Sequence, residues 1–127
     1  MPDHRRTLGA QGEALAAAHL ERQGYRIVGR NVRADGVELD LVAARGKLRV
    51  FVEVKTRRSR SLGLPEEAID GRKQERLVRG AAAWMREHRV RSASVRFDVI
   101  AVERSADGAW TLRHLPGAFD ASHQRGW

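Results

Sequence analysis

The sequence predicts a mixed α/β domain in which two helices flank a five-stranded mixed sheet. Apolar residues recur at helical spacing in two segments, and apolar and polar residues alternate in five others. The order of these segments is helix, three strands, helix and two strands. Because a helix separates the third and fourth strands, these two strands can pair in parallel through a crossover. The 127 residues suffice for one hydrophobic core, so we expect a single domain over residues 1–127.

The first half of the chain predicts a helix followed by three antiparallel strands. Leucine and alanine residues give helical spacing from Leu8 to Gln23, and Gly24 follows at the position of a left-handed cap. The alternating segments are residues 25–33, 37–44 and 48–57, and short turns connect them.

The second half predicts one helix and two strands. A polar, arginine-rich loop precedes a helix expected from about Arg72 to His88. Alternation then predicts strands over residues 94–103 and 109–115, whereas the tail, residues 116–127, has no pattern of either type. The predicted core therefore covers about residues 8–115.

The composition favours a polyanionic partner. Lysine and arginine number 24 against 16 acidic residues, which gives a net charge of +8 and a sequence pI of about 11.3. The alternative is that the excess of arginine reflects a coding bias.

No apolar run reaches the length of about 20 residues that spans a bilayer, and the first residues lack the apolar segment of a secretory signal. Together with the absence of cysteine, this predicts a cytoplasmic protein without disulfides or zinc-thiolate sites.

Carboxylates lie on one face of the predicted second and third strands. Alternation places Val37, Leu39 and Leu41 on one face of the second strand, and Glu38 and Asp40 on the other. The third strand repeats this arrangement. Its aliphatic row occupies one face, and the opposite face carries Phe51, Glu53 and Lys55.

A register that buries both aliphatic rows together puts Asp40 and Glu53 on the same face of the sheet. A turn centred on Gly46 and Lys47 places Asp40 opposite Glu53, whereas a shift by two residues pairs Glu53 with Glu38. Opposed Cβ atoms are about 4.5 to 5.5 Å apart, which suits two carboxylates that share Mg²⁺ or Mn²⁺. The alternative is a solvated, ion-paired outer face of an ordinary sheet.

The order of Asp40, twelve residues and then Glu53-Val54-Lys55, behind an N-terminal helix, resembles the PD-(D/E)xK nuclease superfamily. That superfamily includes restriction endonucleases and archaeal Holliday junction resolvases. The chain is also similar to the bacterial YraN-like family over nearly all residues up to about 104. The matching residues are Gly12-Glu13, Asn31 with Arg33, Gly36-x-Glu38-x-Asp40, Phe51-Val52-Glu53-Val54-Lys55-x-Arg57, Lys73 and Arg96-Phe97-Asp98. Leu39 stands where the superfamily name has proline.

The resemblance implies a restriction-endonuclease-like fold and a metal-dependent active site. It implies that Asp40 and Glu53 bind Mg²⁺ or Mn²⁺, that Lys55 is the catalytic lysine, and that Glu13 is a helix-borne acid directed toward the metal. The spacing from Glu13 to Ala16 and Ala17 independently places this acid on the inward stripe of its helix. The alternative for Glu13 is an exposed carboxylate that interacts with the helix dipole.

Further basic residues are candidates for phosphate binding. Lys73 lies on the apolar stripe of its helix and can either reach a substrate phosphate or extend to solvent. The candidate phosphate-binding arginines are Arg33, Arg57, Arg58 and Arg60. Asp98 lies in an apolar strand, which favours a buried partner such as an arginine over catalysis.

These observations lead to the hypothesis of a metal-dependent endonuclease that cleaves structured or branched DNA, with DNA favoured over RNA and a homodimer possible. One alternative is a nucleic-acid-binding module that retains the nuclease fold without turnover. Another is an RNA-directed nuclease or a ribonucleoprotein component. Fold alone does not decide among them.

Overall fold

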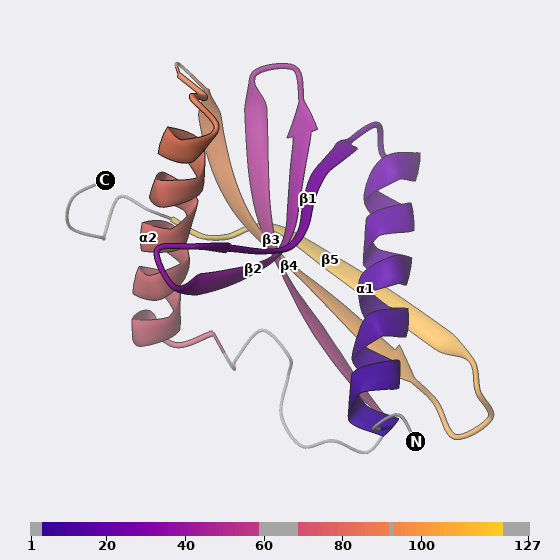
Figure 1. The fold of residues 1–127 in the computed structure, drawn as a ribbon. Coiled ribbons are helices and arrows are strands. Elements are labelled where there is room, and N and C mark those ends of the chain that lie inside the picture. The colour runs from indigo at the N-terminus through magenta and orange to yellow at the C-terminus, as the bar shows by residue number, and fades with distance from the viewer. Residues whose placement is uncertain (1–3, 59–68, 92, 121–127) are drawn as a thin grey trace.

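The computed structural model describes residues 4–58, 69–91 and 93–120 (Figure 1). The elements are α1 (His4–Arg22), β1 (Arg26–Ala34), β2 (Val37–Arg45), β3 (Leu48–Arg58), α2 (Gly71–Glu87), β4 (Ser94–Arg104) and β5 (Trp110–Phe119). The strands form one sheet in the order β1-β2-β3-β4-β5. Neighbours are antiparallel except β3 and β4, which pair in parallel. The predicted fold class, a restriction-endonuclease-like core with a mixed sheet and two helices, is confirmed.

The two helices cover opposite faces of the sheet, as Figure 1 shows. Under α1 the core contains Leu20 with Val50 and Val52 of β3. Under α2 it contains Trp84 with Phe51 of β3. Because successive side chains of β3 alternate between the two faces, this one strand contributes to both halves of the core. Each fully buried large apolar side chain stabilises the fold by about 1.5–3 kcal/mol.

Two glycines allow the helices to approach the sheet closely. A Cβ on Gly12 of α1 would overlap the side chain of Thr56 on β3. A Cβ on Gly80 of α2 would lie 2.8 Å from Cβ of Val37 on β2. Side chains at these two positions would push both helices away from the strands.

The strand β2 leaves β3 halfway along its length. The two strands pair from Arg45 and Leu48 to Leu41 and Val52, and the earlier part of β2 pairs with β1 alone. This departure corrects one expectation. Leu39 packs in the cluster under α2 but Leu41 packs under α1, so the predicted single row of Val37, Leu39 and Leu41 is wrong. Simple alternation fails where the strand changes direction.

The fifth strand is longer than expected and includes part of the predicted featureless tail. It continues through Pro116 and Gly117 to Phe119. Phe119 stacks on Phe97 of β4 with ring centroids 4.9 Å apart, and the Gly117 N–H donates to Asp98 Oδ1 at 3.0 Å. Proline is tolerated here because β5 is an edge strand.

The buried Asp98 has the arginine partner that the sequence predicted. Arg96 donates to both carboxylate oxygens, at 2.8 and 2.9 Å, and also to the Tyr25 hydroxyl at 2.8 Å. His114 Nε2 lies 2.7 Å from Asp98, and His19 Nε2 lies 3.2 Å from His114. Burial alone would raise the pKa of Asp98, but these hydrogen bonds outweigh it and lower the pKa. The network fastens α1 and β5 to β4.

Neither helix of the described residues is both long enough and apolar enough to cross a membrane.

Candidate active site

The candidate site forms where β2 leaves β3. The observed register, extended by one residue beyond Leu41 and Val52, brings Asp40 next to Glu53, and their carboxyl groups are within hydrogen-bonding range. The register with its turn at Gly46 and Lys47 is therefore the one the protein adopts. At this point the Val54 N–H has lost its partner on β2, and it donates to Asp40 Oδ2 at 2.9 Å. The carboxylate thus replaces a backbone acceptor at the end of the strand pairing.

Asp40 and Glu53, hereafter the acidic pair, share one proton at neutral pH. Burial, a hydrogen bond with Glu53 and the Glu53 charge raise the pKa of Asp40 to about 8. Burial would also raise the pKa of Glu53, but hydrogen bonds from Asp40 and Lys73 lower it. Two adjoining carboxylates cannot both ionise at low cost, so one keeps its proton. A hard cation could take the place of that proton.

Two lysines lie beside Glu53. Lys73 of α2 places its Nζ 3.0 Å from the buried Glu53 Oε2. Asp70 caps the helix by accepting from the Lys73 N–H at 2.9 Å, and this fixes the first turn. Lys55 follows Glu53 on the same strand face, and its charge also lowers the Glu53 pKa. Lys73 therefore turns toward the acidic pair, although part of its side chain stays exposed.

Glu13 approaches the acidic pair from the opposite helix. Asn31 Nδ2 donates to Glu13 Oε1 at 3.0 Å, and the charge of Glu13 contributes to the raised pKa of Asp40. Glu13 also lines a pocket of about 160 Å³ together with Arg30 and Leu41. Glu13 is half-exposed, and its carboxylate lies on the side of α1 that faces β1.

Asn31 is a positioning residue for which no role was predicted. Its φ of 48° lies in the left-handed region, which asparagine tolerates better than most residues. This conformation occurs on β1 beside the bend of β2, and the side chain holds Glu13. Its place among the residues shared with the YraN-like family, and its position inside an alternating strand, are the signals that could have identified this role.

Among the described residues, the carboxylates of this site do not by themselves form a complete set of metal ligands. Within residues 4–58, 69–91 and 93–120, no group of three or more histidine, aspartate or glutamate side chains could by itself hold a metal ion. The predicted set of Asp40, Glu53 and Glu13 is thus not assembled as a three-carboxylate site. The acidic pair still fits Mg²⁺ or Mn²⁺, because such ions commonly use one or two carboxylates and leave other positions to water and phosphate. The shared proton marks the place where a positive charge is favoured.

The other predicted residues lie around this centre. Glu38 is exposed and pairs with Arg33 at 3.8 Å, which agrees with an ion-pair role for Glu38. Arg57 lies 3.8 Å from Glu103, and Arg58 is exposed at the end of β3. Arg60 lies outside the described residues.

Relatives of this chain were found by comparison with known proteins. Residues 12–102 match the model of a family described as "Uncharacterised protein family UPF0102". A UPF0102 protein of Syntrophotalea carbinolica is 46% identical over 127 residues, with all of both chains covered. One from Geobacter sulfurreducens is 43% identical over 120 residues, with 94% of each chain covered. One from Beutenbergia cavernae is 48% identical over 110 residues, which cover 87% of this chain and 93% of the relative. The chain therefore belongs to the uncharacterised family UPF0102.

Proposed function

We propose that this chain is a Mg²⁺- or Mn²⁺-dependent endonuclease that cleaves phosphodiester bonds in structured or branched DNA. The observation that carries the proposal is the acidic pair at the end of the β2–β3 pairing, with the ammonium of Lys73 3.0 Å from Glu53. Carboxylates forced together in this way raise each other's cost of ionisation, and a divalent cation relieves it. The resemblance to PD-(D/E)xK nucleases supports the same assignment.

Each residue has a role that its position supports. Asp40 and Glu53 would hold the cation, which supplies charge stabilisation at the phosphate and a more acidic water. Lys55, on the same face as Glu53, would stabilise the negative charge that develops on the phosphate oxygens. Lys73 neutralises Glu53 in the free protein, and its flexible stem allows the ammonium to turn toward a substrate phosphate. Glu13, held by Asn31, would orient water on the α1 side.

Cleavage of defined DNA structures tests the proposal. The purified full chain is incubated with single-stranded, flap and four-way-junction DNA in Mg²⁺ or in Mn²⁺, alongside Glu53→Gln. Glu38→Gln is the matched control, because Glu38 is an exposed carboxylate that pairs with Arg33 on the neighbouring strand. We expect Glu53→Gln to lose at least about 100-fold in cleavage rate and Glu38→Gln to retain the wild-type rate. Equal cleavage by wild type and Glu53→Gln would refute the catalytic assignment.

A nucleic-acid-binding module without turnover is the second candidate function. One observation favours it, because the acidic pair is already neutralised by a shared proton and by Lys73. A protein of this kind would bind DNA with equal affinity in the wild type and in Glu53→Gln, and neither would cleave any substrate with either metal.

A further inference from the structure

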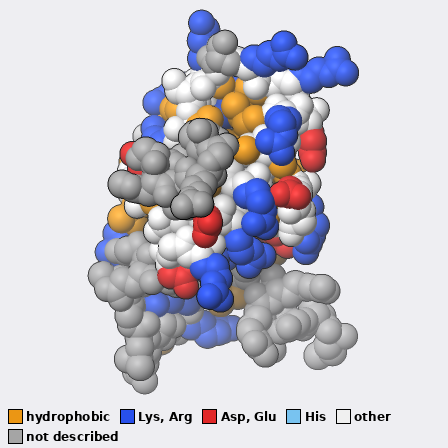
Figure 2. Space-filling model, turned by 90° about the vertical axis from the view of Figure 1, so that its left-hand side faces the viewer, with side chains coloured by type: hydrophobic (Ala, Val, Ile, Leu, Met, Phe, Trp, Pro, Cys, Tyr) orange, Lys and Arg blue, Asp and Glu red, His pale blue; other side chains and the backbone are white. Residues whose placement is uncertain are grey.

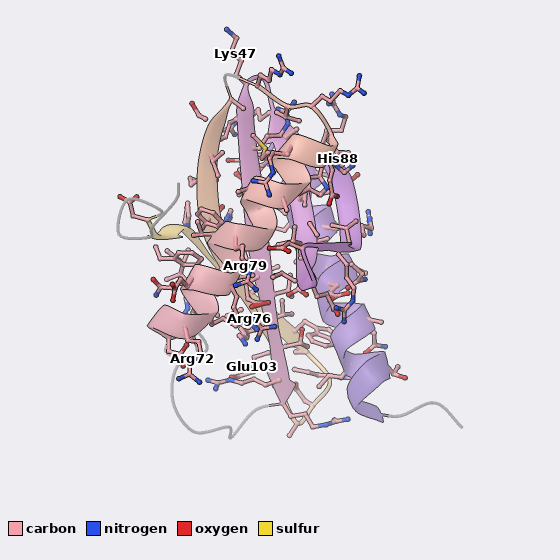
Figure 3. The ribbon with its side chains drawn as sticks, turned by 60° about the vertical axis from the view of Figure 1, so that its left-hand side comes forward. Lys47, Arg72, Arg76, Arg79, His88 and Glu103 are labelled. Carbon is pink, nitrogen blue, oxygen red and sulfur yellow. The ribbon has the colours of Figure 1, made fainter. Side chains whose placement is uncertain are left out.

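The exposed face of α2 carries a line of arginines that the acidic pair does not use. Arg72, Arg76, Arg79 and Arg86 are separated by four, three and seven residues, and all four are exposed. At about 100° per residue these spacings fall on one face of a helix. Figure 3 shows Arg72, Arg76 and Arg79 in line along α2. We call these four residues the arginine stripe.

One of the four stripe arginines has an ion-pair partner among the described residues, and the exposed Glu75 lies one helical turn from Arg72 and Arg79. Arg79 pairs with Asp35 at 3.1 Å, and both side chains are exposed. Within the part of the chain that the structure describes, Arg72, Arg76 and Arg86 form no ion pair. Figure 2, which views the molecule from the α2 side, shows lysine and arginine side chains along this face with acidic side chains among them. Like charges one helical turn apart cost a few tenths of a kcal/mol, so a polyanion would be attracted here.

The stripe begins beside the acidic pair and leads away from it. Lys73, whose ammonium contacts Glu53, is the chain neighbour of Arg72. From Arg72 to Arg86 the helix rises about 21 Å, at about 1.5 Å per residue. Phosphates of one DNA strand follow each other at about 3.4 Å along the duplex axis, so the stripe spans about six of them. The stripe runs from Arg72 toward the end of the molecule that carries Lys47 and His88 in Figure 3.

We infer that the arginine stripe binds the phosphate backbone of a double-stranded DNA arm, so that the scissile strand reaches the acidic pair past Lys73. This inference rests on the proposed function and names the surface that binds the substrate. The contacts are to phosphates, so binding is independent of base sequence and sensitive to salt.

Binding without cleavage tests the stripe separately from the acidic pair. Fluorescence anisotropy of a labelled DNA duplex is measured with the full chain in EDTA, over a range of salt concentrations. Arg72→Gln/Arg76→Gln is compared with Arg22→Gln/Arg26→Gln, a control that removes the same charge from exposed residues around the C-terminal end of α1. Glutamine keeps helix propensity, and thermal melting checks that both variants fold.

We expect the stripe variant to weaken duplex binding about tenfold at low salt, and to lower the slope of log affinity against log salt by about 2, near 0.9 per phosphate contact. The control should change both quantities much less.

Equal losses of affinity in the two variants would overturn the proposal that the stripe binds duplex DNA. Tighter wild-type binding to duplex RNA than to duplex DNA would overturn it as well. If Glu53→Gln abolishes cleavage but the stripe variant binds DNA normally, DNA binding by the stripe is refuted and the endonuclease activity is supported. If the stripe variant loses DNA binding but no substrate is cleaved by the wild type, DNA binding by the stripe is supported and the endonuclease activity is refuted.

Discussion

Replacing Asp40 with asparagine should stabilise the metal-free protein, and the gain should increase with pH. The pKa of Asp40 rises from 3.8 to about 8 on folding, because of burial and then of Glu53. Between these two values the folded state holds a proton that the unfolded state has released. The free energy of unfolding of the wild type therefore falls as the pH rises through this window.

The size of the effect follows from the same shift. One proton of difference costs at most about 1.4 kcal/mol for each pH unit, which amounts to about 4 kcal/mol between pH 4 and pH 7. Asparagine does not ionise. Its amide oxygen can still accept from the Val54 N–H, and its amide nitrogen can donate to Glu53. We expect a gain of about 2 kcal/mol at pH 7, half the limit, because these neutral hydrogen bonds are weaker than those of the carboxyl group.

Urea unfolding in EDTA at several pH values from about 5 to about 8 measures this difference. The stability of Asp40→Asn minus that of the wild type should widen steadily over the range and stop widening above about pH 8. Glu38→Gln, which removes an exposed carboxylate from the same strand, should show no such trend. A difference that is constant with pH, or an Asp40→Asn protein less stable than the wild type at every pH, would refute the shared-proton description.

Three further changes test other parts of the structure. Asp98→Asn should cost about 3–5 kcal/mol in urea unfolding, since it leaves a partly buried guanidinium without its carboxylate. Gly12→Ala should cost about 1–3 kcal/mol in the same measurement, because the new methyl group overlaps Thr56; an unchanged midpoint would contradict this packing. Lys73→Met should tighten Mn²⁺ binding about fivefold, read from the Mn²⁺ dependence of the melting temperature, because no ammonium competes for Glu53. Weaker Mn²⁺ binding would contradict it.

Most of the sheet could be predicted because its strands carry two kinds of information. Alternation located each strand, and the need to bury two aliphatic rows together left two β2–β3 registers open, of which the protein adopts the one that places Leu41 opposite Val52. The end of β5 could not be found in this way. Pro116 and Gly117 weaken any strand pattern, and what extends the strand is tertiary: the stacking of Phe119 and the hydrogen bond to Asp98.

The sequence predicted which residues belong to the candidate site better than it predicted the backbone geometry that positions them. Asp40 and Glu53 lie side by side, as one of the two predicted registers placed them, and Glu13 lies on the side of α1 that faces Asn31 of β1. The bend of β2 at Asp40 could not be predicted from the sequence. Leu39 and Leu41 are both buried but on opposite faces of the sheet, and the sequence pattern is the same as that of a straight strand with both on one face. The role of Lys73 depends on how α2 docks on the sheet, which no local pattern describes.

The bend of β2 has a structural and a chemical consequence at the same residue. When β2 leaves β3, the Val54 N–H needs an acceptor, and Asp40 provides it. An asparagine oxygen could also accept this hydrogen bond and would avoid the repulsion from Glu53. The carboxylate is therefore the less stable choice for the fold alone, and Lys73 on α2 partly offsets its cost by neutralising Glu53. A residue that lowers stability where a neutral substitute fits is typical of a functional site, so the stability gain of Asp40→Asn also tests whether this centre serves chemistry.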